Sequence, residues 1–127
     1  MIIDHCRDVE ELRKLYEERP MPLQYDFDWL INNPNLFCFY DEKKEGKFSG
    51  FITIQKEELE DVGKVLTLSG TSIKGIMPEV VSAINKICEA FNDNIYSFTK
   101  LRHAALVLRK AGFEKIGTNL YMRTKNG

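Results

Sequence analysis

Two spacings of hydrophobic residues alternate along the chain. The helical spacing first follows Asp8, a residue type that caps helices, and ends before Pro20, because proline cannot continue a helix. A second, shorter helix is predicted over residues 26–34, with acidic residues in its first turn and an Asn-Pro pair at its end. The apolar positions of the first helix are Val9, Leu12, Leu15 and Tyr16.

Two longer amphipathic helices are predicted in the second half of the chain. Residues 78–91 begin with a proline, which suits a first helical turn. Residues 101–113 are closed by Gly112, which can adopt the left-handed conformation that ends helices. The expected buried stripe of the first of these helices is Val80, Val81, Ile84, Ile87, Cys88 and Phe91.

Runs of β-branched and aromatic residues predict the strands. Residues 36–40 and 47–55 flank a charged, glycine-bearing turn and form a hairpin. Residues 57–63 are predicted as a polar connector, and residues 114–125 as one bent strand or a tight hairpin. The remaining predicted strands are residues 1–4, 64–70 and 95–99.

The order of these elements predicts the fold class. A helix crosses between the strands at 64–70 and 95–99, so these two strands should be parallel neighbours, whereas the earlier hairpin is antiparallel. We expect an α/β (α+β) fold with a mixed central sheet and helices on both faces. A chain of 127 residues with 43% hydrophobic residues fits a single domain spanning residues 1–127.

Composition excludes several classes of protein. The net charge of -1 gives no general affinity for nucleic acid or anionic membranes, although seven of the 18 Lys and Arg residues and only one acid lie in residues 100–127. That basic segment is either an anion-attracting surface or an ordinary solvated face, and a nucleic-acid binder is the weakest alternative. Three widely spaced cysteines indicate reduced thiols and no metal site. Without an apolar run of 18 residues, we expect a soluble, intracellular protein.

Three segments resemble the GNAT (GCN5-related N-acetyltransferase) superfamily. The opening "IIDHCRDVEELRKLY" is similar to the family's first strand and helix, and "SIKGIMPEVVSAI" falls where its pyrophosphate loop, R/Q-x-x-G-x-G/A, precedes an apolar helix. The segment "LRHAALVLRKAGFEKIGTNLYM" resembles the family's N-x-x-A-x-x-L-Y-x-x-x-G-F ending. The resemblance covers nearly the whole chain and implies acetyl-CoA as acyl donor and an amine as acceptor.

The resemblance also implies where acetyl-CoA would bind. Backbone N–H groups at a helix start point outward with partial positive charge, and glycine allows a diphosphate to approach closely. This sequence departs from the motif at Ser72, where Arg or Gln is usual, at Met77, which replaces a small residue, and at Pro78, which lacks an amide hydrogen. The implied cofactor-binding residues are Leu68, Ser69, Gly70, Lys74, Gly75, Ile76 and Met77.

The catalytic residues of the family are only partly matched. Leu108 stands at the position of the tyrosine that protonates the leaving thiolate, and Leu101 replaces the motif's asparagine. His103 on the same helix and Tyr121 on a late strand are the candidate catalytic residues. The acidic side chains Glu57, Glu58 and Glu60 are further candidates for a base, acting directly or through water.

Two functions therefore compete. One is an N-acetyltransferase that relies on positioning and electrostatics more than on a dedicated acid. The other is a non-catalytic GNAT-fold protein that serves in binding or assembly, with a protein partner or as a homo-oligomer, similar to small bacteriophage GNAT-like proteins such as virion components. The expected location is the cytoplasm in the first case and the virion in the second.

Overall fold

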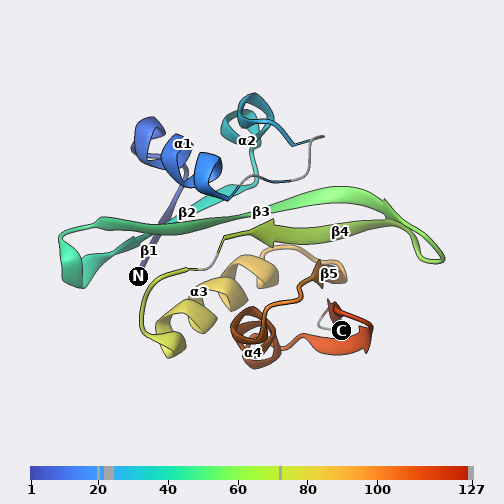
Figure 1. The fold of residues 1–127 in the computed structure, drawn as a ribbon. Helices are drawn as coiled ribbons and strands as arrows, with labels where there is room; N and C mark the ends of the chain where they lie inside the picture. Colours follow the sequence, from blue (N-terminus) through green and yellow to red (C-terminus); the bar gives the residue numbers. More distant parts are fainter. Residues whose placement is uncertain (20, 22–24, 72, 126–127) are drawn as a thin grey trace. The chain divides into compact units, whose positions relative to one another are not determined.

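The described residues, 1–19, 21, 25–71 and 73–125, gather into two units in a computed structural model of the chain (Figure 1). The first unit contains residues 1–53 and 70–75, and the second contains residues 54–69 and the chain from residue 76 onward. The elements in chain order are β1 (Ile2–Asp4), α1 (Val9–Glu18), α2 (Phe27–Asn32), β2 (Leu36–Asp41), the short 3₁₀ helix η1 (Glu42–Lys44), β3 (Lys47–Leu59), β4 (Gly63–Gly70), α3 (Met77–Glu89), β5 (Ile95–Phe98), α4 (Arg102–Lys110), β6 (Glu114–Gly117) and β7 (Leu120–Arg123).

The strands form a mixed sheet in the hydrogen-bonded order β1-β2-β3-β4-β5-β7-β6. β4 and β5 run parallel, as the crossing helix between them predicted. The pairs β1–β2, β2–β3, β5–β7 and β6–β7 are antiparallel. The predicted mixed α/β class is therefore confirmed, while the extent of one domain over residues 1–127 stays a prediction.

Aspartate caps begin both α-helices of the first unit. The Asp8 carboxylate accepts hydrogen bonds from the amides of Glu10 and Glu11 at 3.0 and 3.3 Å. The Asp26 carboxylate accepts one from the Trp29 amide at 2.8 Å. Each cap satisfies donors that a helix start leaves without an intrahelical partner. The sequence located the start of α1 after Asp8 correctly, whereas α2 begins at Phe27 and Asp26 is its cap.

The core of the first unit lies between these helices and the hairpin of β2 and β3. α1 and α2 lie side by side over β2 and β3 (Figure 1). Leu12 of α1 and Leu30 of α2 are fully buried there. The buried cluster consists of Leu12, Leu30, Leu36, Cys38, Tyr40 and Phe51. Burial of each large apolar side chain contributes about 1.5–3 kcal/mol.

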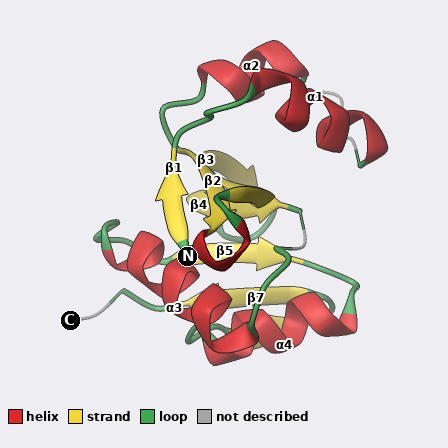
Figure 2. Cartoon of the chain, turned by 90° about the vertical axis from the view of Figure 1, so that its left-hand side faces the viewer, coloured by secondary structure: helices red, strands yellow, loops and turns green. Residues whose placement is uncertain are grey.

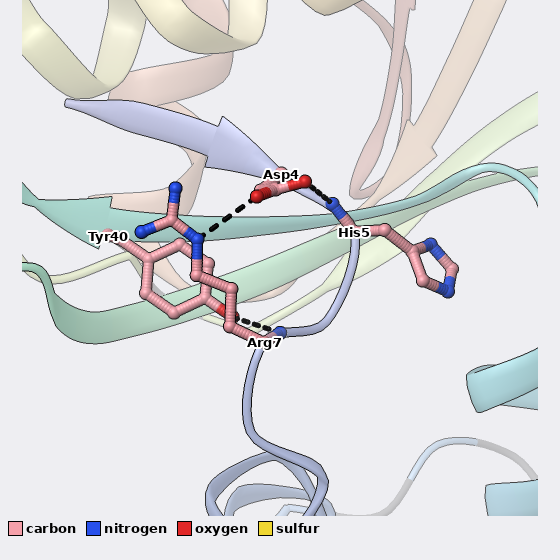
Figure 3. Close-up of polar contacts among 4 residues, drawn as sticks. All are labelled: Asp4, His5, Arg7 and Tyr40. Atoms are coloured by element: carbon pink, nitrogen blue, oxygen red, sulfur yellow. Dashed lines mark hydrogen bonds and ion pairs between the residues drawn. The ribbon is translucent and has the colours of Figure 1, made fainter.

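The turn from β1 into α1 is held by Asp4, Arg7 and Tyr40 (Figure 3). Arg7 Nε donates to the Asp4 carboxylate at 3.0 Å, and the guanidinium carbon lies 4.7 Å from the centroid of the Tyr40 ring. The Arg7 backbone N–H donates to the Tyr40 hydroxyl at 2.8 Å. Hydrogen bonds from Arg7 and from the His5 amide hold the pKa of Asp4 below its usual value. These contacts join the start of α1 to β2.

In the second unit, α3 and α4 lie side by side along β5 and β7 (Figure 2). The predicted stripe of α3 is buried except at Val81 and Phe91, which are half-buried. On α4, Leu108 is buried. The helix ends at Lys110 with Ala111 as its C-cap, and Gly112 follows with a φ of +93°. The buried residues of α3 are Val80, Ala83, Ile84, Ile87 and Cys88.

One alternative left open by the sequence is settled in this unit, and the predicted polar connector at residues 57–63 is wrong in its first part. β6 and β7 form a tight hairpin in which Gly117 lies opposite Leu120 and Asn119 adopts a φ of +59°. β3 runs on to Leu59, through residues that had been predicted as a polar connector. Its last four residues are exposed or half-exposed, so charged side chains project into solvent while the backbone stays in the sheet.

Arg123 of β7 is a basic residue inside the second unit, only 7% exposed. Its Nε donates to the carbonyl oxygen of Ala111 at 3.2 Å, at the end of α4. Its Nη2 donates to Asn85 Oδ1 on α3 at 2.8 Å. A cation is favourable at the negative end of a helix dipole, here the end of α4. Through these two hydrogen bonds Arg123 joins β7 to α3 and α4, and because it is buried it does not add to the basic surface.

The three thiols should differ in reactivity. Burial raises the pKa of Cys38 to about 12 and that of Cys88 to about 11, so both remain neutral thiols at pH 8. Burial also raises the pKa of Cys6, but its side chain is half-exposed. We expect iodoacetamide at pH 8 to alkylate Cys6 first, as followed by peptide mass spectrometry. A urea-unfolded sample is the control, and equal rates at Cys6 and Cys38 in the folded protein would contradict this prediction.

Candidate active site

The parallel pairing of β4 with β5 is short. Leu66 lies opposite Ile95, Thr67 opposite Tyr96, and Leu68 opposite Ser97, where the register ends. The Ser97 hydroxyl also donates to the Leu68 carbonyl oxygen at 2.9 Å. Ser69 continues β4 beyond the last pair, whereas Phe98 of β5 pairs with Leu120 of β7 on the other side. The two strands therefore stop sharing hydrogen bonds before they end, as in a site where a ligand lies between strands.

Several exposed apolar side chains belong to residues that follow β4 or β5 in the chain. Phe98 is the last residue of β5 and is 64% exposed, and Leu101, just before α4, is 57% exposed. Ile76, just before α3, is 53% exposed. Single exposed apolar residues are ordinary, but Phe98 and Leu101 lie three positions apart at the carboxyl end of β5 and form a candidate surface for an apolar ligand.

The start of α3 offers backbone donors. Ile76 is the N-cap, and its carbonyl accepts from the amides of Glu79 and Val80 at 2.9 and 3.1 Å. Pro78 has no amide hydrogen. The amides of Ile76 and Met77 donate to no other residue in the described part of the chain. Two N–H groups at a positive helix end can therefore contact an anion such as a phosphate.

The segment before this helix start belongs to the first unit and runs along β3. The Thr71 amide donates to the Phe51 carbonyl oxygen, and the Lys74 amide donates to that of Ser49, both at 2.9 Å. The resemblance had implied that Lys74 would offer its backbone to a diphosphate, but its N–H already has a partner. Ser72 lies outside the described residues. Gly75, with a φ of +157°, makes the turn that leads into the helix.

A polar cluster occupies β3 and β4 within the second unit. Gln55 is 8% exposed, and its Nε2 lies 2.9 Å from Ser69 Oγ, 3.0 Å from Thr67 Oγ1 and 3.3 Å from Glu57 Oε1. Sequence reasoning listed Glu57 as a candidate base but missed Gln55. A signal for Gln55 was present in the sequence. Side chains alternate along a strand, so Gln55 lies on the same face of β3 as Phe51 and Thr53, which are both fully buried.

Other kinds of site find less support. Among the described residues, no group of three or more His, Cys, Asp and Glu side chains is arranged to hold a metal ion. In the same part of the chain, no helix combines the length and the apolar character that a membrane span requires.

Solved acetyltransferase structures match this arrangement over nearly the whole chain. Tetrahymena GCN5 matches with a TM-score of 0.61 and 12% identity, covering 99% of this chain and 97% of that one. A protein assigned as a phosphinothricin N-acetyltransferase gives 0.62 and 13%, covering 99% of both chains. A GNAT-family acetyltransferase from Streptococcus pneumoniae gives 0.57 and 14%, covering 95% of both. The chain has the GNAT fold.

The likeness lies in structure far more than in sequence. No protein-family model matches the chain, and no curated protein is significantly similar to it. Identities of 12–14% show a divergent GNAT fold and leave activity to be argued from the residues present.

The candidate catalytic residues of this GNAT fold differ in their exposure to solvent. Leu108, at the usual position of the acid, is 4% exposed and cannot donate a proton. His103 is exposed in the first turn of α4. Tyr121 is 5% exposed, lies opposite Ser97 in the sheet, and has the guanidinium carbon of Arg109 6.0 Å from its ring centroid. No hydrogen bond or ring contact within the described ranges joins His103 to Tyr121.

Gly70 at the end of β4 should be irreplaceable for steric reasons. Its φ is +150°, and an added Cβ would overlap the Phe51 carbonyl oxygen and lie 2.7 Å from the Ile52 Cα. We expect Gly70→Ala to lower the free energy of unfolding by about 2–4 kcal/mol, measured in urea. The matched control is Gly46→Ala, at a φ of +74° with no atom within 4 Å, which should cost about 1–2 kcal/mol. Equal losses in the two variants would refute the steric explanation.

Proposed function

We propose that the protein is an acyl-CoA-dependent N-acetyltransferase that transfers an acetyl group from acetyl-CoA to an amine. The observation that supports this most is the end of the β4–β5 ladder at Leu68 and Ser97. The carboxyl ends of parallel strands are a common place for ligands in α/β folds, and Ser69 there has no partner on β5. Ile76 and Met77 would donate to the phosphates, and Phe98 and Leu101 would contact the apolar arm.

The transfer needs a base and an acid from the protein. When bound, acetyl-CoA supplies a thioester whose carbonyl carbon is open to attack by an amine. Glu57 would take the proton that the amine loses, and His103 would protonate the leaving sulfur. His103 is an exposed histidine in the first turn of α4, the helix whose N-cap is Leu101. Tyr121, also a candidate from the sequence, would act from a buried position or serve only in packing.

A non-catalytic role is the second candidate, and a specific observation favours it. The Lys74 amide is already bonded to Ser49, Pro78 offers no amide, and Leu108 replaces the acid. A GNAT fold with these losses would serve in binding or assembly, for example as a homo-oligomer or a bacteriophage virion component. The two candidates differ first in whether acetyl-CoA binds.

Acetyl-CoA should stabilise the folded protein. At a ligand concentration about a hundred times the dissociation constant, binding adds roughly 2.7 kcal/mol, which raises the melting temperature measurably. Phe98→Ser should weaken binding by removing apolar contact, while Leu106→Ser, at an exposed position on α4, is the control. Met77→Gly should strengthen binding, because it opens the approach to the helix start. A melting temperature unchanged by millimolar acetyl-CoA in the parent and in Met77→Gly would favour the non-catalytic role.

His103→Ala should lower kcat by about a hundredfold if this histidine protonates the thiolate. Release of the free thiol from acetyl-CoA is followed with a panel of primary amines. Tyr121→Phe distinguishes the other candidate, since it removes only the hydroxyl from a buried ring. Full activity in both variants would remove these two residues from the mechanism, and no thiol release by the parent protein would refute the enzymatic proposal.

A further inference from the structure

The cluster around Gln55 has a geometry that a structural role alone does not require. Gln55 Nε2 carries two N–H groups and faces three oxygens, those of Ser69, Thr67 and Glu57. A carboxylate can only accept hydrogen bonds, so the presence of Glu57 fixes which end of the Gln55 amide faces the cluster. The hydroxyls of Thr67 and Ser69 can rotate to accept, and the amide is held between β4 and the Glu57 side chain.

The cluster is joined to the candidate site through the strand that both share. Ser69 is the β4 residue immediately after the last β4–β5 pair, and Thr67 lies opposite Tyr96 within that pairing. Side chains alternate along a strand, so Thr67 and Ser69 share one face of β4, and Leu66 and Leu68 share the other. Gln55 therefore connects Glu57 to the residues at which the two parallel strands separate.

Within this cluster of four residues, Glu57 carries the carboxylate, whereas the other three side chains are an amide and two hydroxyls. Its side chain is half-buried, whereas the next residue, Glu58, is exposed. A base must reach the reacting amine directly or through one water, and its orientation decides whether it can. Rotational freedom at the end of a glutamate side chain is lost when a buried amide donates to it.

We infer that Gln55 is a positioning residue that orients the Glu57 carboxylate as the base for the amine acceptor. The inference rests on the proposed acetyltransferase function. In the reaction, the amine nitrogen forms a bond to the acetyl carbon, the carbon–sulfur bond breaks, and the electron pair leaves on sulfur. The proton lost by the amine goes to Glu57, and the sulfur gains one from His103 or solvent. No oxidant or reductant is needed.

A double-mutant cycle on kcat tests the inference. Glu57→Gln should lower kcat by about a hundredfold. Gln55→Met, of similar shape and without the amide, should lower kcat about tenfold and leave the KM for acetyl-CoA unchanged. Because Gln55 acts through Glu57, the double variant should be no slower than Glu57→Gln alone. Glu114→Gln, at an exposed position on β6, is the control and should retain full activity.

Stability gives a readout independent of turnover. A cycle of Gln55→Met and Glu57→Ala is measured by urea unfolding, where the two substitutions should be non-additive because each removes one partner of the same hydrogen bond. If Gln55→Met fails to fold, Gln55→Glu replaces it, since a carboxylate can accept from the hydroxyls of Thr67 and Ser69 but cannot donate to Glu57.

The outcomes separate the two claims. Multiplicative losses of kcat in an active protein would show that Gln55 acts independently of Glu57 and would overturn the positioning role. Full activity of Glu57→Gln would overturn its role as base while leaving the acetyltransferase proposal intact. An inactive parent protein would overturn the proposed function, and with it the catalytic meaning of the cluster.

Discussion

The parallel contact between β4 and β5 is the constraint on which the candidate site depends. Parallel strands cannot be joined by a tight turn, so the chain must cross from the end of β4 to the start of β5 through α3. α4 follows the carboxyl end of β5 in the chain. The three residue pairs of this contact end at Leu68 and Ser97. After them, β4 leads toward α3, and β5 leads through the exposed Phe98 toward α4.

This constraint also explains which features the sequence could predict. The cap at Asp8, the left-handed Gly112 and the crossing helix are local signals, because each depends on residues within one or two turns. The parallel pair followed from connectivity alone. These features were correctly anticipated, and together they carried the GNAT resemblance that the fold bears out.

The details of the site were less predictable, since they depend on partners distant in sequence. The Lys74 amide is bonded to Ser49, 25 positions earlier, which no motif comparison reveals. In the sequence, Gln55 is an ordinary strand residue. Its hydrogen bonds to Thr67 and Ser69 arise only because β4 pairs beside β3. Arg123 reads as one more surface cation in a basic segment, but it is buried against α3 and α4.

The hydrogen bonds between residues 71–74 and β3 have a consequence for any ligand of the helix start. Loops that wrap around a phosphate usually lose conformational freedom at the moment of binding, which weakens affinity. Here the amides of Thr71 and Lys74 are fixed by Phe51 and Ser49 in the free protein. Within the first unit, these two amides are therefore held by the backbone of β3 without any ligand.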